Sequence, residues 1–189
     1  TVNNLNAQNI NGNTPLDMIM ESESPADLLE SIKDVASLQK LLLAKGYEGN
    51  TFLHTLAVPQ TDDNETKFQV TYNKIFKIAK KFIVGTLIQE NEFGSSAIYE
   101  AVMNKNIDFL KAALPEDLSS DNLKLVLKAG DANTIMHAAF LEGNTEIINF
   151  IISKIGSDST LLTTSNMNGN TPISNLFENG SFTTIFANI

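Results

Sequence analysis

A short phrase recurs five times along this chain of 189 residues. Its Thr or Ser stands at positions 14, 51, 96, 134 and 171, so successive copies are 37, 45, 38 and 37 residues apart. The copies are Gly12-Asn13-Thr14, Gly49-Asn50-Thr51, Gly94-Ser95-Ser96, Ala132-Asn133-Thr134 and Gly169-Asn170-Thr171. Three nearly equal spacings and one that is about eight residues longer indicate a structural period with a single insertion. We therefore expect an array of similar units.

The phrase predicts a turn that leads into a short helix. Gly suits the turn, and Thr or Ser is a preferred N-cap because its hydroxyl accepts from a backbone N–H that has no partner inside the helix. Pro15 and Pro172 follow the cap, at the first helical position, where a missing N–H costs nothing. Apolar residues two, five and six positions after each cap share one helix face: Leu16, Ile19 and Met20; Leu53, Leu56 and Ala57; Ile98, Ala101 and Val102; Met136, Ala139 and Phe140; Ile173, Leu176 and Phe177. A second helical run follows, clearest at 106–114 and 143–152, and stacking such pairs buries faces that one pair leaves exposed.

These motifs resemble the ankyrin repeat. The residues in phase with the family's phrase are Thr134, His137, Ala138, Ala139, Gly143, Ile147 and Ile148 in the fourth copy, and Thr171, Pro172 and Gly180 in the fifth. The resemblance implies an all-α fold, an ankyrin-repeat solenoid of stacked helix-turn-helix units with longer inter-repeat segments. It covers 1–189 as a single domain, with approximate repeats at 3–34, 35–90 (with an inserted loop at 59–67), 91–128, 129–163 and 164–189. We expect this domain to be part of a longer chain.

The sequence departs from the family pattern in several places. The period is 37 or 38 residues instead of about 33, and the extra residues, in runs such as 36–43 and 121–127, predict an added helical turn or a short third helix. Ala132 replaces the turn glycine, which puts a left-handed turn there in doubt. The stretch from Phe68 to about Glu90 predicts the longest helix, with its buried side formed by Ile75, Phe76, Ile78, Ala79, Phe82, Ile83 and Leu87. Its other side carries Lys74, Lys77, Lys80 and Lys81, which we interpret as a solvated helix face in preference to a docking site for an acidic partner.

Composition excludes several classes of function. The net charge is −9 and all 13 basic residues are lysines, which argues against a surface for nucleic acid or anionic lipid. The chain has no Cys, which excludes disulfides, a thiol nucleophile and Cys-ligated metals. No stretch approaches the roughly 20 apolar residues that span a bilayer. We expect a cytoplasmic protein that binds neither nucleic acid nor membrane.

The sequence offers little for catalysis. Its only histidines, His54 and His137, occupy the same offset in two copies, where the resemblance implies a structural His that bonds neighbouring turn backbone. Hydrolase, zinc-protease, P-loop and dinucleotide motifs are absent. The acidic run at 62–65 lacks the ligand spacing of a calcium loop, so an exposed loop is the better interpretation. We expect no enzyme activity, no cofactor and no metal.

The family implies protein binding on the concave side, formed by the turn tips and the exposed face of the first helices. The candidate protein-binding residues at those positions are Tyr47, Glu48, Glu92, Phe93, Met103, Asn104, Asp131, Leu141, Glu142, Met167 and Asn168. Tyr47, Phe93, Met103 and Met167 are the preferred anchors, because aromatic and Met residues are enriched in interface cores. The acidic members of the set suggest a partner protein with a basic surface.

Two other classes stay open at this point. The repeats could recruit substrate for a larger enzyme whose catalytic domain lies outside this chain, or could bind a small molecule or nucleic acid, which the acidity and the lack of Arg disfavour. Heavy use of Lys, Asn and Ile without Arg is typical of AT-rich genomes. Degenerate arrays of this kind are similar to those of effectors that intracellular bacteria inject into host cells, which suggests a secreted effector acting on a host protein in the host cytoplasm.

Overall fold

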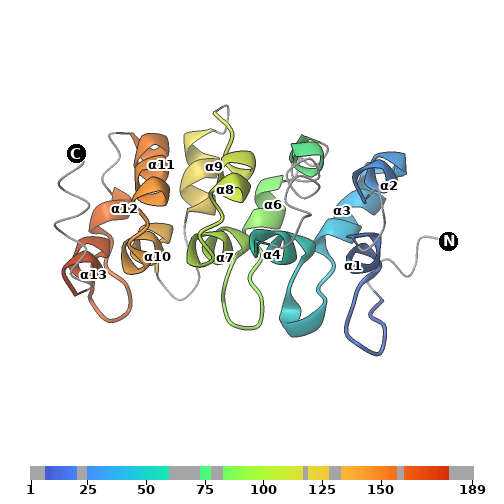
Figure 1. Cartoon of the computed structure of the whole chain (residues 1–189), viewed down its shortest axis with the longest axis horizontal. Helices are drawn as coiled ribbons and strands as arrows, with labels where there is room; N and C mark the ends of the chain where they lie inside the picture. Colours follow the sequence, from blue (N-terminus) through green and yellow to red (C-terminus); the bar gives the residue numbers. More distant parts are fainter. Residues whose placement is uncertain are drawn as a thin grey trace.

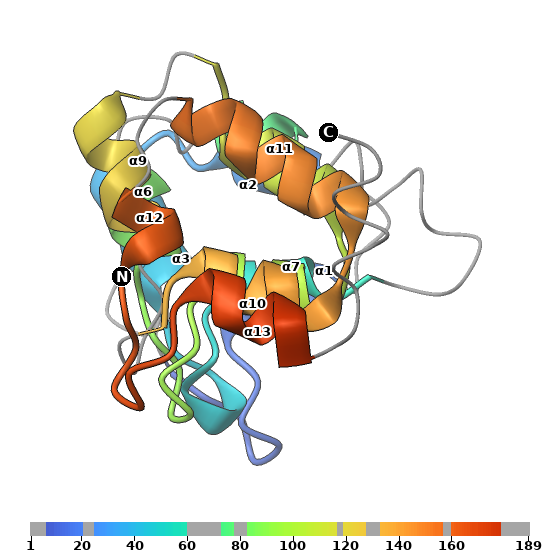
Figure 2. The ribbon, with the colours of Figure 1, turned by 90° about the vertical axis from the view of Figure 1, so that its left-hand side faces the viewer.

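The computed structural model describes residues 7–20, 25–59, 73–77, 83–116, 119–127, 133–156 and 160–178. Within these residues the regular structure is helical, apart from two isolated β-bridges, Lys45 with Thr51 and Glu90 with Ser96. The helices lie in three rows, seen end-on in Figure 2. The first row contains α1 (Pro15–Met20), α4 (Phe52–Ala57), α7 (Ala97–Met103), α10 (Ile135–Glu142) and α13 (Pro172–Glu178). The predicted all-α class is confirmed.

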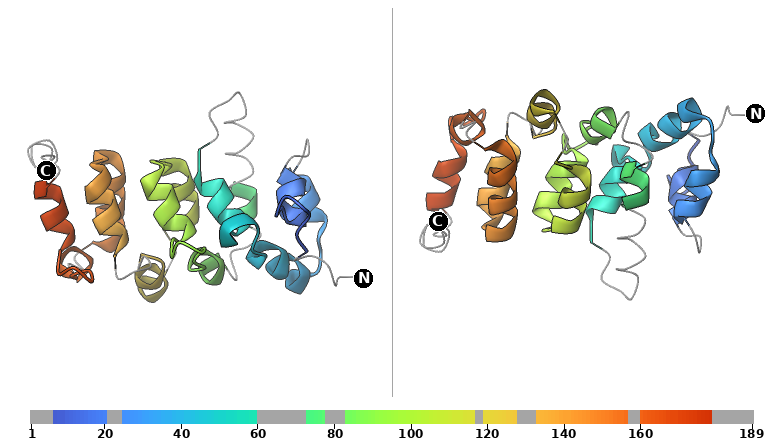
Figure 3. Two further views of the ribbon diagram at one scale, coloured as in Figure 1. Left: turned by 90° about the horizontal axis from the view of Figure 1, so that it is seen from below. Right: turned by 90° about the horizontal axis from the view of Figure 1, so that it is seen from above.

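The other two rows pack on the first. The second row contains α2 (Pro25–Ser31), residues 73–77, α8 (Ile107–Ala113) and α11 (Thr145–Ile155). The third row contains α3 (Val35–Leu43), α6 (Ile83–Leu87), α9 (Ser120–Val126) and α12 (Thr160–Thr163). Because α3 and α9 coincide with the runs 36–43 and 121–127, the predicted short third helix is confirmed there. Successive units follow one another along the long axis, with α1 and α13 at opposite ends (Figures 1 and 3).

The prediction of one long helix from Phe68 to about Glu90 is wrong. Residues 73–77 belong to the second row, where the Phe76 ring meets Phe109 of α8 edge-on at 5.4 Å, whereas α6 packs against α9 in the third row and ends at Leu87. Apolar residues at helical spacing cannot distinguish one helix from two that meet different neighbours. Ile75, Phe76, Ile83 and Leu87 are buried as predicted, while Ile78, Ala79 and Phe82 lie outside the described residues or side chains.

Two of the four lysines predicted for the outer face can be placed. Lys74 makes an ion pair with Asp27 of α2, with 2.8 Å between Nζ and Oδ1, and Lys77 is exposed. Lys80 and Lys81 lie outside the described residues, as does the inserted loop beyond Pro59. Lys74 therefore connects second-row segments of the first two units.

The hydrophobic core runs along the whole stack. In the second, third and fourth copies every apolar residue predicted for the first-helix face is buried, and in the first copy Leu16 is fully buried and Ile19 partly buried. Each full burial of such a side chain contributes roughly 1.5–3 kcal/mol. The prediction is wrong for Ile173 and Phe177 of the fifth copy, which are 37% and 60% exposed, while the side chains of Met20 and Leu176 lie outside those described.

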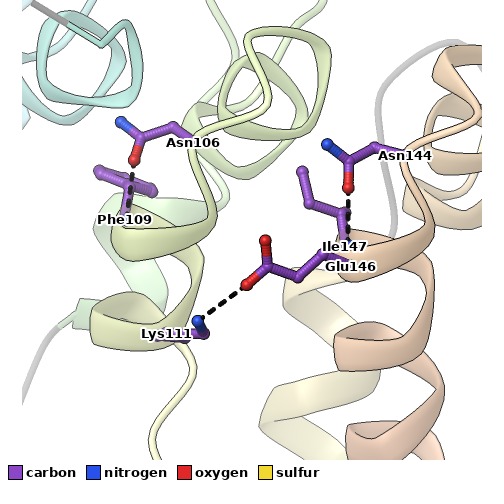
Figure 4. Close-up of polar contacts among 6 residues, drawn as sticks. All are labelled: Asn106, Phe109, Lys111, Asn144, Glu146 and Ile147. Atoms are coloured by element: carbon purple, nitrogen blue, oxygen red, sulfur yellow. Dashed lines mark hydrogen bonds and ion pairs between the residues drawn. The ribbon is translucent and has the colours of Figure 1, made fainter.

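Helix starts are capped as predicted. The side chains of Thr51 and Thr134 accept from the third helical N–H in capping boxes, and Ser96 Oγ accepts from the backbone N–H of Tyr99 at 3.3 Å. In the second row, Asn106 and Asn144 cap α8 and α11 in the same way, at 3.0 and 3.1 Å (Figure 4). The repeated phrase therefore encodes where the helices begin.

Second-row helices are also connected from one unit to the next. Asn106 Nδ2 donates to the carbonyl of Ala57 at the end of α4, at 3.1 Å. Lys111 of α8 reaches Glu146 of α11, with 3.1 Å between Nζ and Oε1 (Figure 4). Most of the stability of this row comes from packing, because an exposed ion pair contributes about 0–1 kcal/mol.

Candidate functional site

Four loops of the same construction project in one direction from the first row (Figure 1). They comprise residues 9–13, 46–50, 91–95 and 166–170, and each ends one residue before the cap of a first-row helix. In each loop the first N–H donates to the fifth carbonyl at 2.7–2.9 Å, and the fourth residue, always Gly, donates its N–H to the first carbonyl at 3.0–3.1 Å. The glycines Gly12, Gly49, Gly94 and Gly169 all have a positive φ, as predicted for the turn. The corresponding loop of the fourth copy, with Ala132, lies outside the described residues.

An asparagine side chain closes three of the loops. The Oδ1 atoms of Asn9, Asn91 and Asn166 each accept two backbone N–H groups, from the third and fifth loop residues, at 2.9–3.0 Å. Asn suits this position because its short amide hydrogen-bonds to backbone two residues further on. Each closed loop holds its tip in a defined geometry without help from a partner.

The amide nitrogens of the same residues connect one unit to the next. Asn91 Nδ2 donates to Oδ1 of Asn50 at 2.9 Å, and Asn166 Nδ2 donates to Oδ1 of Asn133 at 3.0 Å. A neutral amide both donates and accepts, so a row of Asn can form such bonds without accumulating charge. Much of the asparagine in the repeated phrase thus serves the junctions between units.

The loops also pack closely on one another. A Cβ atom at Gly12 would lie 3.3 Å from Cβ of Tyr47, and one at Gly49 would lie 3.0 Å from both Cγ and N of Glu92. The Glu92 N–H in turn donates to the carbonyl of Glu48 at 3.0 Å. The second residue of one loop therefore lies over the glycine of the loop before it, which leaves little room for a Cβ, so space as well as φ favours glycine there.

Each histidine joins a helix start to the following loop. The N–H of Thr51 donates to Nδ1 of His54 at 3.1 Å, so Nδ1 carries no proton and Nε2 donates to the carbonyl of Ser95 at 2.8 Å. His137 repeats the arrangement, with Thr134 at 3.0 Å and the carbonyl of Asn170 at 2.9 Å. The predicted structural role of both histidines is confirmed.

Burial lowers the pKa of His54 below its ordinary value of 6.5, partly opposed by the hydrogen bond to the Ser95 carbonyl and by the nearby carboxylate of Glu100. The neutral ring is therefore the form that fits the folded protein. In the first copy Asp17 takes the place of the histidine. Its Oδ2 accepts from the N–H and hydroxyl of Thr14 at 2.7 and 2.8 Å, which reproduces the cap.

Large apolar side chains stand at the tips of all four described loops. Met167, Tyr47 and Phe93 are 76%, 66% and 64% exposed, and Ile10 is fully exposed. Sequence reasoning found the first three and missed Ile10. The signal was present, because Ile10, Tyr47 and Met167 each stand two residues before the loop glycine.

The structure brings only part of the predicted set together. Tyr47, Glu48, Glu92 and Phe93 share the adjoining second and third loops, and Met167 and Asn168 form the tip of the last. The remaining described candidates, Met103, Asn104, Leu141 and Glu142, lie at the far ends of α7 and α10, seven or eight residues and roughly 10 Å along the helix from the caps. Asp131 lies outside the described residues.

Side chains at these far ends are less available than those of the tips. Met103 is partly buried and packs against the core, whereas Leu141 is 49% exposed. Asn104 Nδ2 donates to the carbonyl of Glu100 at 2.8 Å, and Glu142 forms an ion pair with Lys105 at 3.5 Å. The loop tips are therefore the stronger part of the candidate surface.

The described residues contain neither a cluster of metal ligands nor a membrane-spanning helix. Among them, no three His, Asp or Glu side chains gather as metal ligands, and no buried side-chain polar atom lacks a hydrogen-bond partner. A cleft of about 250 Å³ lies between the second and third rows, near Phe76, Ile83 and Ala113, away from the loops.

None of the described helices is long and apolar enough to cross a membrane. A scan against models of known protein families and a search of curated proteins find no match for this chain.

Proposed function

We propose that the chain is a degenerate ankyrin-repeat solenoid and works as a non-enzymatic module that binds a partner protein through its loop tips. The repeated loop, the Thr–His helix cap and the stacking of similar units support the ankyrin assignment. The binding role rests on one observation above all, the exposed apolar side chains at the tips of the four described loops.

Burial of apolar surface favours binding at these tips. Large apolar side chains gain roughly 1.5–3 kcal/mol each when a partner removes them from water. Flexible loops lose much of that gain to ordering, but all four loops are closed by their own backbone bonds, and three of them also by an Asn side chain, before any partner arrives. Apolar groups on preformed supports are typical of interface anchors.

A pair of matched variants tests the proposal. The tip variant replaces Tyr47 and Phe93 by Ser, and the control variant replaces Leu28 of α2 and Val35 of α3, which are 45% and 54% exposed, by Ser. All four side chains are substantially exposed, so each change should alter stability by about 0.5 kcal/mol or less.

Each protein, immobilised at equal density, is incubated with eukaryotic cytosol, and the captured proteins are quantified by mass spectrometry. We expect a discrete set of proteins that the control variant retains and the tip variant loses. Equal capture by both variants and the parent protein would show that the loop tips do not mediate binding.

A further inference from the structure

The exposed tips carry negative charge beside their apolar side chains. Glu48 directly follows Tyr47, and Glu92 directly precedes Phe93. Backbone and side-chain packing join the two loops, because the Glu92 N–H donates to the Glu48 carbonyl at 3.0 Å and Glu92 Cγ lies against Gly49. The half-buried Glu48 and the exposed Glu92, Tyr47 and Phe93 thus lie on two loops that are joined to each other.

These carboxylates differ from those of Asp27, Glu116, Glu142 and Glu146, each of which has a lysine partner. In the second row, Glu146 pairs with Lys111 at 3.1 Å and Asp27 pairs with Lys74 at 2.8 Å, in each case between neighbouring units. Neither Glu48 nor Glu92 makes an ion pair within the described part of the chain. The lysine nearest in sequence, Lys45, uses its Nζ to donate to the Glu90 carbonyl at 2.7 Å.

We propose that the partner presents a linear segment in which Lys or Arg alternates with large apolar side chains, and that it lies across the loops at 46–50 and 91–95. This inference rests on the proposed function. The apolar side chains of the segment would cover Tyr47 and Phe93, while its cations would meet Glu48 and Glu92. An anionic lipid surface or a phosphate backbone would meet the same carboxylates with unfavourable charge, which selects a basic protein segment.

The experiment uses two synthetic peptides with blocked ends, Leu-Arg-Leu-Arg-Leu and Leu-Gln-Leu-Gln-Leu, titrated into the ¹⁵N-labelled protein and followed by NMR. The charge variant carries Glu48→Gln and Glu92→Gln. Its control carries Glu30→Gln and Asp121→Asn, two exposed carboxylates of α2 and α9, so both variants lose the same net charge.

We expect the Arg peptide to shift amide signals of the two loops and to bind the charge variant about fivefold more weakly, less so at high salt, with affinity for the control unchanged. The Gln peptide should bind more weakly than the Arg peptide. Equal weakening in both variants, or no weakening in the charge variant, would overturn the basic segment as the occupant.

The outcomes also separate this inference from the proposed function. If both peptides shifted the loop signals equally, the basic segment would be refuted while the loop tips would stand as a binding surface. If capture from cytosol were also unaffected by Tyr47→Ser with Phe93→Ser, the proposed function itself would fail.

Discussion

Replacing His54 probes the junction between the second and third units. The side chain is 2% exposed and bonds in two directions: Nδ1 accepts from the N–H and the hydroxyl of Thr51 at 3.1 and 2.8 Å, and Nε2 donates to the Ser95 carbonyl at 2.8 Å. His54→Ala leaves the buried Thr51 N–H without a partner, at about 1–3 kcal/mol, and removes the inter-unit bond, at about 1 kcal/mol. We therefore expect a total loss of about 3 kcal/mol in the free energy of unfolding.

A second substitution separates the bonds to Thr51 from the bond to Ser95. The amide oxygen of His54→Asn can still accept from Thr51, as the carboxylate of Asp17 accepts from Thr14, but the shorter side chain cannot reach the next loop. This variant should lose only about 1 kcal/mol. Urea unfolding followed by far-ultraviolet circular dichroism gives both values, together with the slope that reveals loss of cooperativity. Equal destabilisation by Ala and Asn, or a loss below about 1 kcal/mol for Ala, would refute this reasoning.

Three further predictions concern pH and backbone strain. The pKa of His54 is lowered in the folded state, so the stability that the neutral ring contributes is complete above pH 6.5 and is lost as the pH falls from 6.5 toward the lowered pKa. The urea midpoint of the parent protein should therefore drop over that pH range, and that of His54→Asn should drop less. Gly49 has φ +70° and a Cβ there would lie 3.0 Å from the next loop, so Gly49→Ala should lower the free energy of unfolding by at least about 2 kcal/mol. Gly169 has φ +79° with open space around it, so Gly169→Ala should lower it by about 1 kcal/mol. Equal losses in the two variants would argue against close packing of the loops. Lys105 has φ +57° after α7, so Lys105→Gly should raise the free energy of unfolding by about 0.5 kcal/mol although it removes an exposed ion pair. A lower urea midpoint in this variant would contradict the prediction.

The repeated phrase was enough to predict the first row of helices. Glycine, a hydroxyl cap and apolar residues two, five and six positions later are local signals, and they located Leu53, Ile98 and Met136 in the core. The long segment after Phe68 could not be assigned correctly, because its apolar residues have the same spacing in one helix as in two. The exposure of Ile173 and Phe177 could not be predicted either, because burial depends on neighbouring elements that a helical pattern does not specify.

The site was predictable where it repeats and obscure where it depends on contacts between units. Tyr47, Phe93 and Met167 were found from their place before or beside the loop glycine, and Ile10 could have been found by applying the same offset to the first copy. The bond between Asn91 and Asn50 could not, because it joins residues 41 positions apart through a packing that only the fold defines. Met103 lies at the end of α7, where its side chain packs against the core and is only partly exposed, whereas the side chains at the loop tips are exposed.

Site-specific photo-crosslinking tests the central claim most directly. A benzophenone amino acid is placed at Tyr47 in one protein and, as the control, at Asn149, an exposed residue of the second-row helix α11, in another. After illumination in cytosol, a protein that binds through its loop tips should give a discrete crosslinked species from Tyr47 that Glu48→Gln with Glu92→Gln diminishes, and none from Asn149. Crosslinking from Asn149 but not from Tyr47 would contradict the account.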